Sequence, residues 1–253
     1  VGYWHDGLQI KILRFLEQWT THYLANSQAA IDMTIKIEQA KKFKFQLIYN
    51  GLDLAKFKEI NDQMRTEQRK KWNIADSDIV IGIVANLRPV KRHDNVINDA
   101  KTLISENKNL KFVFIGEGPD RAKLEAQIAD FVLTDYFRLP GATTDIVPAL
   151  SGFDIAVLPS SNESFSNSLI EYMAAKLPLI ATKVGGNIEA IEHGENGLLY
   201  DIDDADGLIN SVKEILENDD KAKMMAQNAQ TKAFEEYSID KMIENHQDFY
   251  LNL

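Results

Sequence analysis

Two glutamates joined by a short polar loop are the residues best suited to chemistry. Glu163 follows the apolar run 155–158, and Glu171 lies eight residues later in a helical pattern that begins near Ser166. A second apolar run, 179–181, comes next. Strand, loop, helix and strand in this order form the repeating unit of a parallel α/β sheet, which binds ligands beyond the carboxyl ends of its strands. Both carboxylates are therefore expected at that edge, where they can accept hydrogen bonds from hydroxyl groups.

The loop between the two glutamates is rich in small polar residues. Ser164, Ser166, Asn167 and Ser168 offer hydroxyl, amide and main-chain N–H groups that can face an anion. The helix that begins here adds partial positive charge at its amino terminus. Simpler interpretations stay open: Ser166 as an ordinary helix N-cap, and the two glutamates as surface residues at the ends of a helix.

A basic cluster, Arg88-Pro89-Val90-Lys91-Arg92, follows the near-continuous apolar run 79–85. Fixed cations at this place can stabilise negative charge that develops on a departing phosphate oxygen. Arginine does so bidentately and lysine as a compact point charge. Taken alone, the cluster fits a solvated loop or a helix start equally well. The acidic chain and the glutamate pair favour the phosphate role for Arg88 and Lys91.

Two glycine pairs could let the backbone approach a ligand. Gly116-Glu117-Gly118 follows the apolar run 110–115 and is a weak phosphate-binding signal by itself. It fits a tight turn before a helix with Pro119 in its first turn equally well, and we place its backbone near the ligand. Gly185-Gly186 is expected either to permit a close approach beneath the ligand site or to cap a turn.

Composition limits the classes of function. The 253 residues are 45% hydrophobic and 26% charged, as in ordinary globular proteins. The net charge of −10 is uneven, with 12 Lys and Arg against 8 Asp and Glu in residues 1–75, and 16 against 30 in the remainder. Such an acidic body argues against a nucleic-acid partner. The chain has no cysteine, and no apolar run approaches the ~20 residues of a membrane-spanning helix. Because it opens abruptly on Val1, we expect it to begin inside a longer sequence.

Apolar runs alternate with helical patterns, which predicts the fold class α/β: a doubly wound parallel sheet (Rossmann-like) with a helical carboxy-terminal tail. Strands are expected at 46–49, 79–85, 110–115, 136–139, 155–158, 179–181 and 197–200. Helices are expected at 7–24, 27–40, 62–73, 93–106, 120–131, 145–150, from about 166, and at 187–193, 205–217, 220–236 and 239–250. The strong turn pair Asn50-Gly51 is placed at a domain boundary.

Five blocks of sequence resemble the carboxy-terminal half of a glycosyltransferase of family 4, a family of retaining enzymes with the two-domain GT-B architecture. The blocks are IYNGLD at 48–53, VANLRPVKR at 84–92, FVFIGEGPDR at 112–121, LPG at 139–141 and DIAVLPSSNESFSNSLIEYMAAKLPLIATKVGGNIEAIEHGENGLL at 154–199. They stand in the family's order and spacing over residues 46–235. The resemblance implies three parts: residues 1–50 as the end of a truncated acceptor-binding domain, 51–235 as the nucleotide-sugar-binding domain, and 236–253 as a helix packing back toward the first.

By this resemblance, Glu163 and Glu171 form the family's E-x7-E motif, with Glu163 on hydroxyls of the transferred sugar and Glu171 on the ribose. The implied catalytic residues are Arg88, Lys91 and Glu163, and the implied donor-binding residues are Glu171, Ser166, Asn167, Ser168, Leu169, Gly116, Gly118, Arg138 and Leu139. Arg88 and Lys91 would grip the distal phosphate, and segment 138–141 would hold the base through main-chain groups. The chain departs from the usual E-G-F-G by carrying Ser164 and Ser166, since serine adopts positive φ less freely than glycine.

The resemblance implies a retaining transferase that moves a hexosyl group from a UDP- or GDP-sugar to a saccharide or lipid-linked acceptor in glycan or glycolipid biosynthesis. It implies a cytoplasmic enzyme, and it leaves open a peripheral contact with the inner face of the membrane through the missing domain. No metal or other cofactor is expected. Asp201-Ile202-Asp203 looks like a metal-binding D-x-D, but helix capping explains it better. If nothing precedes Val1, the chain should bind donor and transfer little or no sugar.

Two other functions stay open at this point. One is a nucleotide-sugar epimerase of the same architecture, which would need acid and base groups around the sugar that the sequence does not offer beyond Glu163. The other is a non-catalytic module that senses nucleotide sugars.

Overall fold

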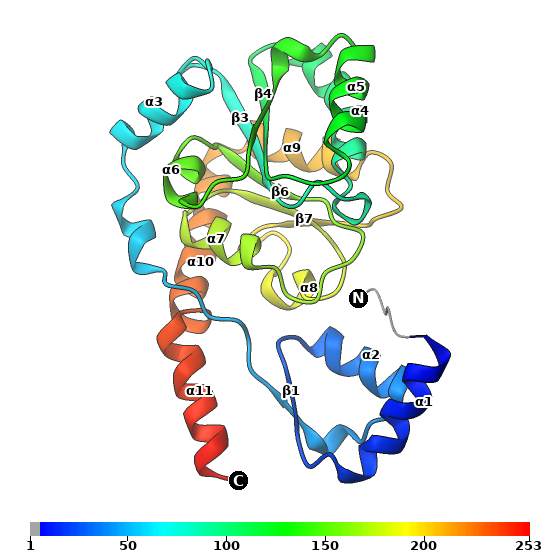
Figure 1. The fold of residues 1–253 in the computed structure, drawn as a ribbon. Helices are drawn as coiled ribbons and strands as arrows, with labels where there is room; N and C mark the ends of the chain where they lie inside the picture. Colours follow the sequence, from blue (N-terminus) through cyan, green and yellow to red (C-terminus); the bar gives the residue numbers. More distant parts are fainter. Residues whose placement is uncertain (1–5) are drawn as a thin grey trace.

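The computed structural model describes residues 6–253, and a six-stranded sheet lies at its centre (Figure 1). The strands are β3 (Ile79–Val84), β4 (Leu110–Ile115), β5 (Phe137–Gly141), β6 (Ile155–Leu158), β7 (Leu179–Thr182) and β8 (Leu198–Tyr200), in the order β5-β4-β3-β6-β7-β8. Every neighbouring pair is parallel. The predicted α/β fold class with a doubly wound parallel sheet is confirmed.

Helices cover both faces of this sheet, which explains why its strands are apolar on both sides. β6 and β7 are buried at every residue, without the alternation of a half-exposed strand. One core contains residues of α6 (Ile146–Ser151), α7 (Asn167–Ala174) and α10 (Asp219–Glu236), and the other contains residues of α4 (His93–Glu106), α5 (Arg121–Asp130) and α9 (Gly207–Glu217). The chain ends in α11 (Ile239–Leu251), so the helical carboxy-terminal tail is confirmed as well.

The strand order reverses at the centre of the sheet, between β3 and β6. From β3 the chain continues outward to β4 and β5, whereas from β6 it continues to β7 and β8. The connections after β3 and β6 therefore leave in opposite directions, and their first residues meet at the carboxyl edge of the sheet. This reversal brings the loop that carries Lys91 against the loop that carries Glu163.

The amino-terminal segment (residues 6–47) forms a small layer of its own below the sheet in Figure 1. It contains α1 (Gly7–Leu16), β1 (Tyr23–Ala25), α2 (Gln28–Glu38) and β2 (Phe45–Leu47), and β1 pairs with β2 in parallel. The helix expected at 7–24 is wrong in its second half: α1 ends at Leu16, a 3₁₀ turn spans Glu17–Trp19, and β1 follows. The pairing with β2 draws this stretch into a strand, and such tertiary context overrides local periodicity.

The chain enters the α/β unit (residues 52–237) at Leu52 and leaves it at Tyr237 toward α11, and these two passages lie side by side. Leu52 N–H donates to the carbonyl of Tyr237 at 3.0 Å, and Ile239 N–H donates to the carbonyl of Leu52 at 2.9 Å. A Cβ added to Gly51 would lie 2.5 Å from the carbonyl oxygen of Ser238. Glycine at position 51 therefore permits the two passages to touch.

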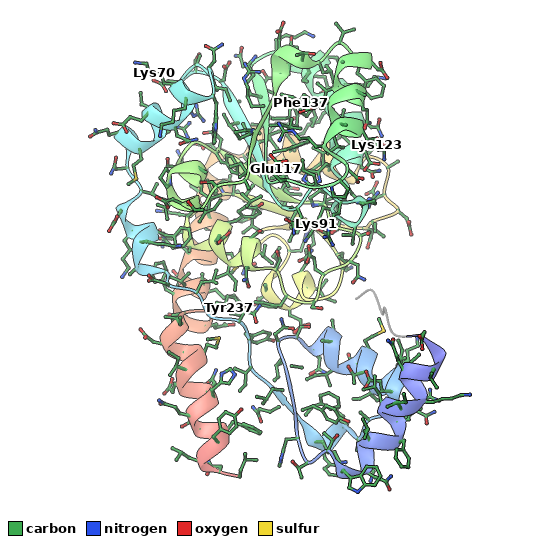
Figure 2. All side chains as sticks on the ribbon, viewed as in Figure 1. Lys70, Lys91, Glu117, Lys123, Phe137 and Tyr237 are labelled. Carbon is green, nitrogen blue, oxygen red and sulfur yellow. The ribbon has the colours of Figure 1, made fainter. Side chains whose placement is uncertain are left out.

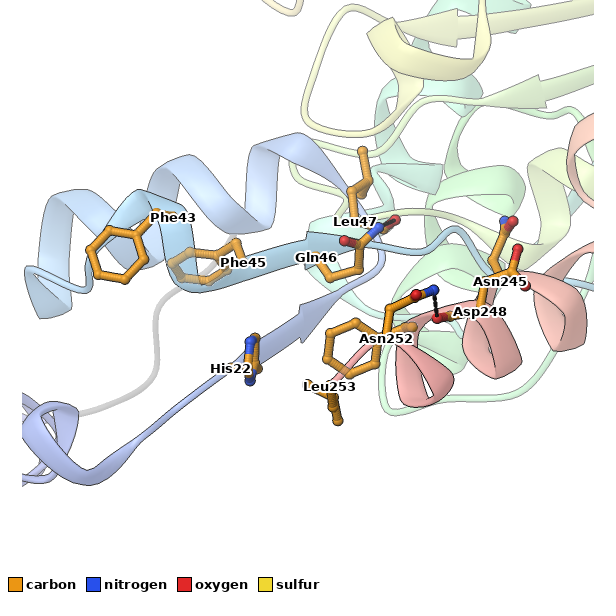
Figure 3. A pocket seen from close by; sticks show the side chains of 10 residues that line it. His22, Phe43, Phe45, Gln46, Leu47, Asn245, Asp248, Asn252 and Leu253 are labelled. Carbon is orange, nitrogen blue, oxygen red and sulfur yellow. Dashed lines mark hydrogen bonds between the residues drawn. The ribbon is translucent and has the colours of Figure 1, made fainter.

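α11 continues from this crossing alongside the amino-terminal segment (Figure 1). The rings of His22 and Phe249 meet edge to face there, with centroids 5.5 Å apart. A hollow of about 560 Å³ lies between α11 and β2 (Figure 3), lined by His22, Phe43, Phe45, Gln46, Leu47, Asn245, Asp248, Phe249, Asn252 and Leu253. The division of the chain into domains at residues 50 and 235 stays a prediction.

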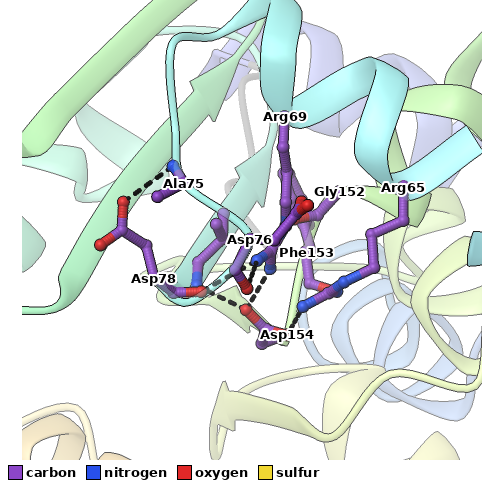
Figure 4. Close-up of polar contacts among 9 residues, drawn as sticks. Arg65, Arg69, Ala75, Asp76, Asp78, Gly152, Phe153 and Asp154 are labelled. Carbon is purple, nitrogen blue, oxygen red and sulfur yellow. Dashed lines mark hydrogen bonds and ion pairs between the residues drawn. The ribbon is translucent and has the colours of Figure 1, made fainter.

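A buried arginine joins α3 (Asp62–Lys71) to the start of β6 (Figure 4). The Arg69 side chain is completely buried and forms an ion pair with Asp154. Its guanidinium also donates to the carbonyls of Gly152 at 3.1 Å and Asp78 at 2.9 Å. Because nearly every donor of the guanidinium has an acceptor, the charge is tolerated inside the protein and fixes α3 to the edge of the sheet.

Candidate functional site

A hollow of about 470 Å³ opens at the carboxyl ends of β3, β4 and β6. Its lining residues are Asn50, Val84, Ala85, Asn86, Lys91, Ile115, Gly116, Ala142, Thr143, Ile146, Glu163, Phe165, Ser166, Asn167 and Ser168. Six residues predicted from the sequence are among them: Lys91, Gly116, Glu163, Ser166, Asn167 and Ser168. The hollow lies where the strand order reverses, between β3 and β6. Its residue Lys91 is labelled in Figure 2.

Lys91 and Glu163 form an ion pair in this hollow. Their side chains are 20% and 10% exposed, so neither is an ordinary surface residue. The loops that carry them are joined as well, since Ser161 N–H donates to the carbonyl of Val90 at 2.8 Å. The pair places an ammonium group and a carboxylate side by side at the end of the central strands, where an anion and a hydroxyl could each find a partner.

The amino terminus of α7 points into the same hollow. Ser166 occupies the N-cap position, but its side chain makes no capping hydrogen bond. The hydroxyl of Ser168 instead donates to the carbonyl of Val84 at 2.8 Å, and Tyr172 accepts from Val84 N–H at 2.6 Å, which fixes α7 to the end of β3. The first turn of α7 contains no acidic residue. Its N–H groups and their partial positive charge are therefore available to an anion.

Gly116 and Gly118 let the turn after β4 lie against the turn after β3. Gly116 has φ +144°, and a Cβ added to it would lie 2.0 Å from the carbonyl oxygen of Ala85. At Gly118 an added Cβ would lie 2.3 Å from the carbonyl oxygen of Leu87. Gly116 lines the hollow, whereas Gly118 supports its wall from outside.

The loop of Glu163 rests directly on Gly185-Gly186. A Cβ added to Gly185 would lie 1.7 Å from the carbonyl oxygen of Glu163, and one added to Gly186 would lie 1.9 Å from that of Ser164. Gly186 N–H also donates to the Glu163 carbonyl at 3.3 Å. Of the two interpretations of this glycine pair, the close approach beneath the site is confirmed.

A second hollow of about 480 Å³ adjoins the first and shares Ile115, Ala142 and Thr143 with it. Residues 140–142 and Trp72 are among those that line it. Together the two hollows form an elongated site, with the Lys91–Glu163 ion pair in the first hollow and segment 140–142 along the second.

Segment 138–141 meets this site only at its glycine end. Arg138 turns its side chain away and donates to the carbonyls of Trp72 at 2.7 Å and Asn73 at 3.2 Å. The carbonyl of Leu139 accepts from Arg121 at 2.8 Å. Pro140 and Gly141, in contrast, line the second hollow.

Three other predicted residues lie outside the first hollow. Arg88 is exposed, and within residues 6–253 its guanidinium has no hydrogen-bond or ion-pair partner. Leu169 is buried in the core of the α/β unit. Glu171 lies on α7, and burial raises the pKa of its carboxyl group from 4.5 to about 7, an effect that the nearby charge of Lys56 reduces.

The sequence prediction missed Asn50, whose side chain belongs to the site. Asn50 Nδ2 donates to Asn167 Oδ1 at 2.9 Å, which ties the passage from the amino-terminal segment to the first residue of α7. The Asn-Gly pair indicated a turn but not what the turn faces. Asn86, Thr143 and Phe165 were missed as well, although the last stands within the predicted loop.

Asp201 and Asp203 precede α9, which begins at Gly207. The N-cap residue of α9 is Asp206, and this helix has no side-chain cap, so the capping proposed for the two aspartates is wrong. Across residues 6–253, no group of three or more His, Asp or Glu side chains could hold a metal ion. Nor is any helix within the described residues long and apolar enough to cross a membrane.

Several known proteins are similar to this chain in sequence or in fold. The family model described as glycosyl transferases group 1 matches residues 64–232. N-acetyl-alpha-D-glucosaminyl L-malate synthase of Bacillus anthracis is 24% identical over 242 residues, which cover 96% of this chain and 62% of that protein. The 2-deoxystreptamine glucosyltransferase of Streptomyces kanamyceticus is 30% identical over 228 residues, which cover 88% of this chain and 58% of that protein. The chain thus spans less than two thirds of these relatives.

Among solved structures, HepE of Anabaena in complex with UDP and glucose superposes with a TM-score of 0.90 at 21% identity, covering 98% of this chain and 68% of that one. The likeness shows a common fold, the Rossmann-like domain of the GT-B architecture with its helical carboxy-terminal region. The family match spans β3 to β8 and includes both Glu163, which lines the hollow, and Glu171 on α7. The chain therefore belongs to the group 1 glycosyl transferases.

Proposed function

We propose that this chain binds the donor in a retaining glycosyltransferase of family 4, which moves a hexosyl group from a nucleoside diphosphate sugar to an acceptor in glycan or glycolipid biosynthesis. The observation that carries the proposal is the Lys91–Glu163 pair beside the uncapped amino terminus of α7. A cation and free N–H groups suit a diphosphate, and a carboxylate suits the hydroxyls of a sugar. One elongated ligand with both parts fits this arrangement.

The cations serve the leaving group. When the bond between the anomeric carbon and the diphosphate breaks, its electron pair stays on the phosphate oxygen. Lys91 lies in the hollow to meet this charge, and the α7 amino terminus adds its partial charge. Arg88 lies three residues before Lys91 in the same loop. Its side chain is exposed, so it can turn toward the distal phosphate.

Glu163 is proposed to hold the sugar. Its Oε1 accepts from Lys91, while Oε2 has no hydrogen-bond partner in the described part of the chain. That oxygen can accept from sugar hydroxyls while the ion pair keeps the carboxylate in place. Glu171 is proposed to accept from the ribose hydroxyls further along the site.

The second hollow is proposed to hold the base against the main chain of 140–142. HepE binds UDP, and we therefore expect a UDP-sugar rather than a GDP-sugar. A saccharide or lipid-linked acceptor, a cytoplasmic location, a peripheral contact with the membrane and a reaction without metal are part of the same proposal.

Calorimetric titration with UDP, GDP and ADP tests the donor site, with the wild-type chain and Glu171→Ala. We expect one nucleotide, UDP, to bind and the variant to bind it at least about tenfold more weakly, since hydrogen bonds to a charged acceptor are the strong ones. Glu192→Ala is the matched control, because that side chain is 72% exposed and contacts Lys232 instead. Equal binding by the wild type and Glu171→Ala would exclude Glu171 from the site, and no binding of any nucleotide would contradict the proposal for this chain.

A further inference from the structure

Glu189 belongs to the α/β unit, but its carboxylate accepts hydrogen bonds from the amino-terminal segment. It lies on α8 (Asn187–Ala190), which stands at the lower edge of the sheet in Figure 1, facing that segment. Glu189 Oε2 accepts from Gln28 N–H at 2.8 Å, and Oε1 accepts from Ala29 N–H at 2.9 Å. The hydroxyl of Tyr49 donates to Oε2 at 3.2 Å. One carboxylate thus binds three donors, all of which precede the crossing at Gly51.

These contacts complete the amino terminus of α2. The first N–H groups of a helix have no partner within the helix. In α2 the Ser27 hydroxyl accepts from Ala30 N–H at 3.1 Å, and Glu189 takes the two N–H groups before it. The first turn of α2 has no acidic residue of its own. The negative charge that stabilises this helix terminus therefore comes from the other part of the molecule.

Glu189 is held in a fixed relation to the donor-site loop. The glycines that precede α8 carry the loop of Glu163 on their backbone. Asn187, at the start of α8, is completely buried and donates to the carbonyl of Thr182 at 3.0 Å. A displacement of the α8 backbone would therefore break its contacts with the end of β7 and with the loop of Glu163.

A second path joins Glu189 to the same loop through aromatic rings. Tyr49, which binds Glu189, packs against Phe165 with ring centroids 4.9 Å apart. Phe165 lines the hollow, and Tyr237 closes the group from the crossing between the two parts (Figure 2). Burial and the charge of Glu189 raise the pKa of Tyr49 to about 12, so its hydroxyl stays a donor at physiological pH.

We propose that Glu189 is a positioning residue: it latches the amino-terminal segment onto the donor-site loop and sets the orientation of the two parts. The contact is charge-assisted and bidentate, which gives it direction as well as strength. It does not depend on which ligand the site binds. The proposal therefore goes beyond the proposed function and can fail separately from it.

A distance measurement between spin labels tests the latch. The chain has no cysteine, so Lys36→Cys on α2 and Lys108→Cys in the α/β unit, both exposed positions, give one label on each part. In this background Glu189→Gln keeps the size of the side chain, but it removes the charge and replaces one acceptor oxygen by an amide NH₂, which cannot accept from the N–H group it faces. We expect the distance distribution to broaden. Glu192→Gln, the same change on an exposed side chain nearby, should leave it unchanged.

A rescue variant separates a latch from a simple helix cap. Ala30 stands three residues after the N-cap Ser27, so Ala30→Glu creates a capping box within α2 itself. In the Glu189→Gln background we expect this change to restore the helix, seen as slower hydrogen exchange in α2, while the distance distribution stays broad. If it restored the distance distribution too, Glu189 would be a cap and no more.

The two proposals are then distinguished by UDP titration of the same variants. We expect Glu189→Gln to bind UDP within about twofold of wild type, because Glu189 does not line the site. A narrow, wild-type distance distribution in Glu189→Gln would overturn the latch, whether UDP binds or not. If the wild-type chain does not bind UDP, the proposed donor site is wrong, and the proposal for Glu189 is unaffected.

Discussion

At the scale of single residues, the Lys91–Glu163 pair decides what the site can bind. Each partner is largely buried, so each would bear an uncompensated charge without the other. An incoming diphosphate offers Lys91 a second anion, and sugar hydroxyls offer Glu163 new donors. The pair therefore holds both side chains in place until the ligand arrives.

Replacing Lys91 tests its role in the departure of the diphosphate. We expect Lys91→Ala to lower the turnover of the proposed transfer reaction by about 10²–10³, by analogy with the removal of one oxyanion donor. The measurement is the rate of sugar transfer at saturating donor. Lys108→Ala, an exposed lysine far along the chain, is the control. Turnover close to wild type would remove Lys91 from the mechanism.

Glu171 predicts a pH dependence of stability. Burial raises its pKa from 4.5 to about 7, so the folded state binds more protons than the unfolded state between these values. The free energy of unfolding should therefore fall as pH rises through this window. Glu171→Gln, which stays neutral, should flatten the slope. Urea unfolding at several pH values between 4.5 and 7 measures the free energy of unfolding. If Glu171→Gln left its pH dependence unchanged, the Glu171 carboxyl would not be the group that titrates in this range.

At the scale of elements, the turn before α8 lies directly beneath the loop of Glu163. Gly186 has φ −66°, which alanine adopts without strain, yet its added Cβ would lie 1.9 Å from the Ser164 carbonyl. A substitution there tests the steric contact alone, because the backbone conformation is ordinary.

We expect Gly186→Ala to displace the loop of Glu163 and to lower the free energy of unfolding by about 1–3 kcal/mol, as overpacking does. UDP should bind more weakly as well, although Gly186 does not line the site. Thermal unfolding and calorimetry measure the two effects. Gly7→Ala is the control, since nothing lies within 4 Å of its added Cβ. If Gly186→Ala were as stable as the wild type, the loop of Glu163 would not lie against Gly186 as described.

The strands of the central sheet were predictable because buried parallel strands are continuous apolar runs, as in 79–84 and 155–158. β1 was not, because three residues of strand depend on a partner that periodicity cannot reveal. In the site, Lys91 and Glu163 were predictable from residue type and position after a strand. The orientation of the Arg138 side chain was not predictable. It depends on hydrogen bonds to the carbonyls of Trp72 and Asn73, which come near Arg138 only in the folded chain.

At the scale of the whole molecule, burial is unevenly distributed. α1 has no buried residue, and in residues 6–47 the buried apolar side chains are Ile31 and Ala40. The strands β3, β4 and β6, in contrast, have buried residues on both faces. Local stability follows buried apolar contacts, so the two parts should open at different free energies.

Hydrogen exchange measured by mass spectrometry checks this difference. We expect peptides of α1 to exchange first and those of β3, β4 and β6 last. Saturating UDP should slow exchange in residues 163–168 and leave α1 unchanged, because a ligand protects the region it binds. Uniform exchange along the chain would contradict the uneven stability, and protection of α1 alone would place the nucleotide elsewhere.

The hydrogen bonds between Leu52 and the turn at 237–239 mean that the α/β unit starts and finishes at one point. A unit with adjacent ends can be exchanged, duplicated or inserted as a cassette without stretching the chain that receives it. Recombination at these two positions would carry every residue that lines the two hollows, except Asn50, in a single piece. With the proposed function, a change of donor specificity would then pass between relatives without any change in the rest of the chain.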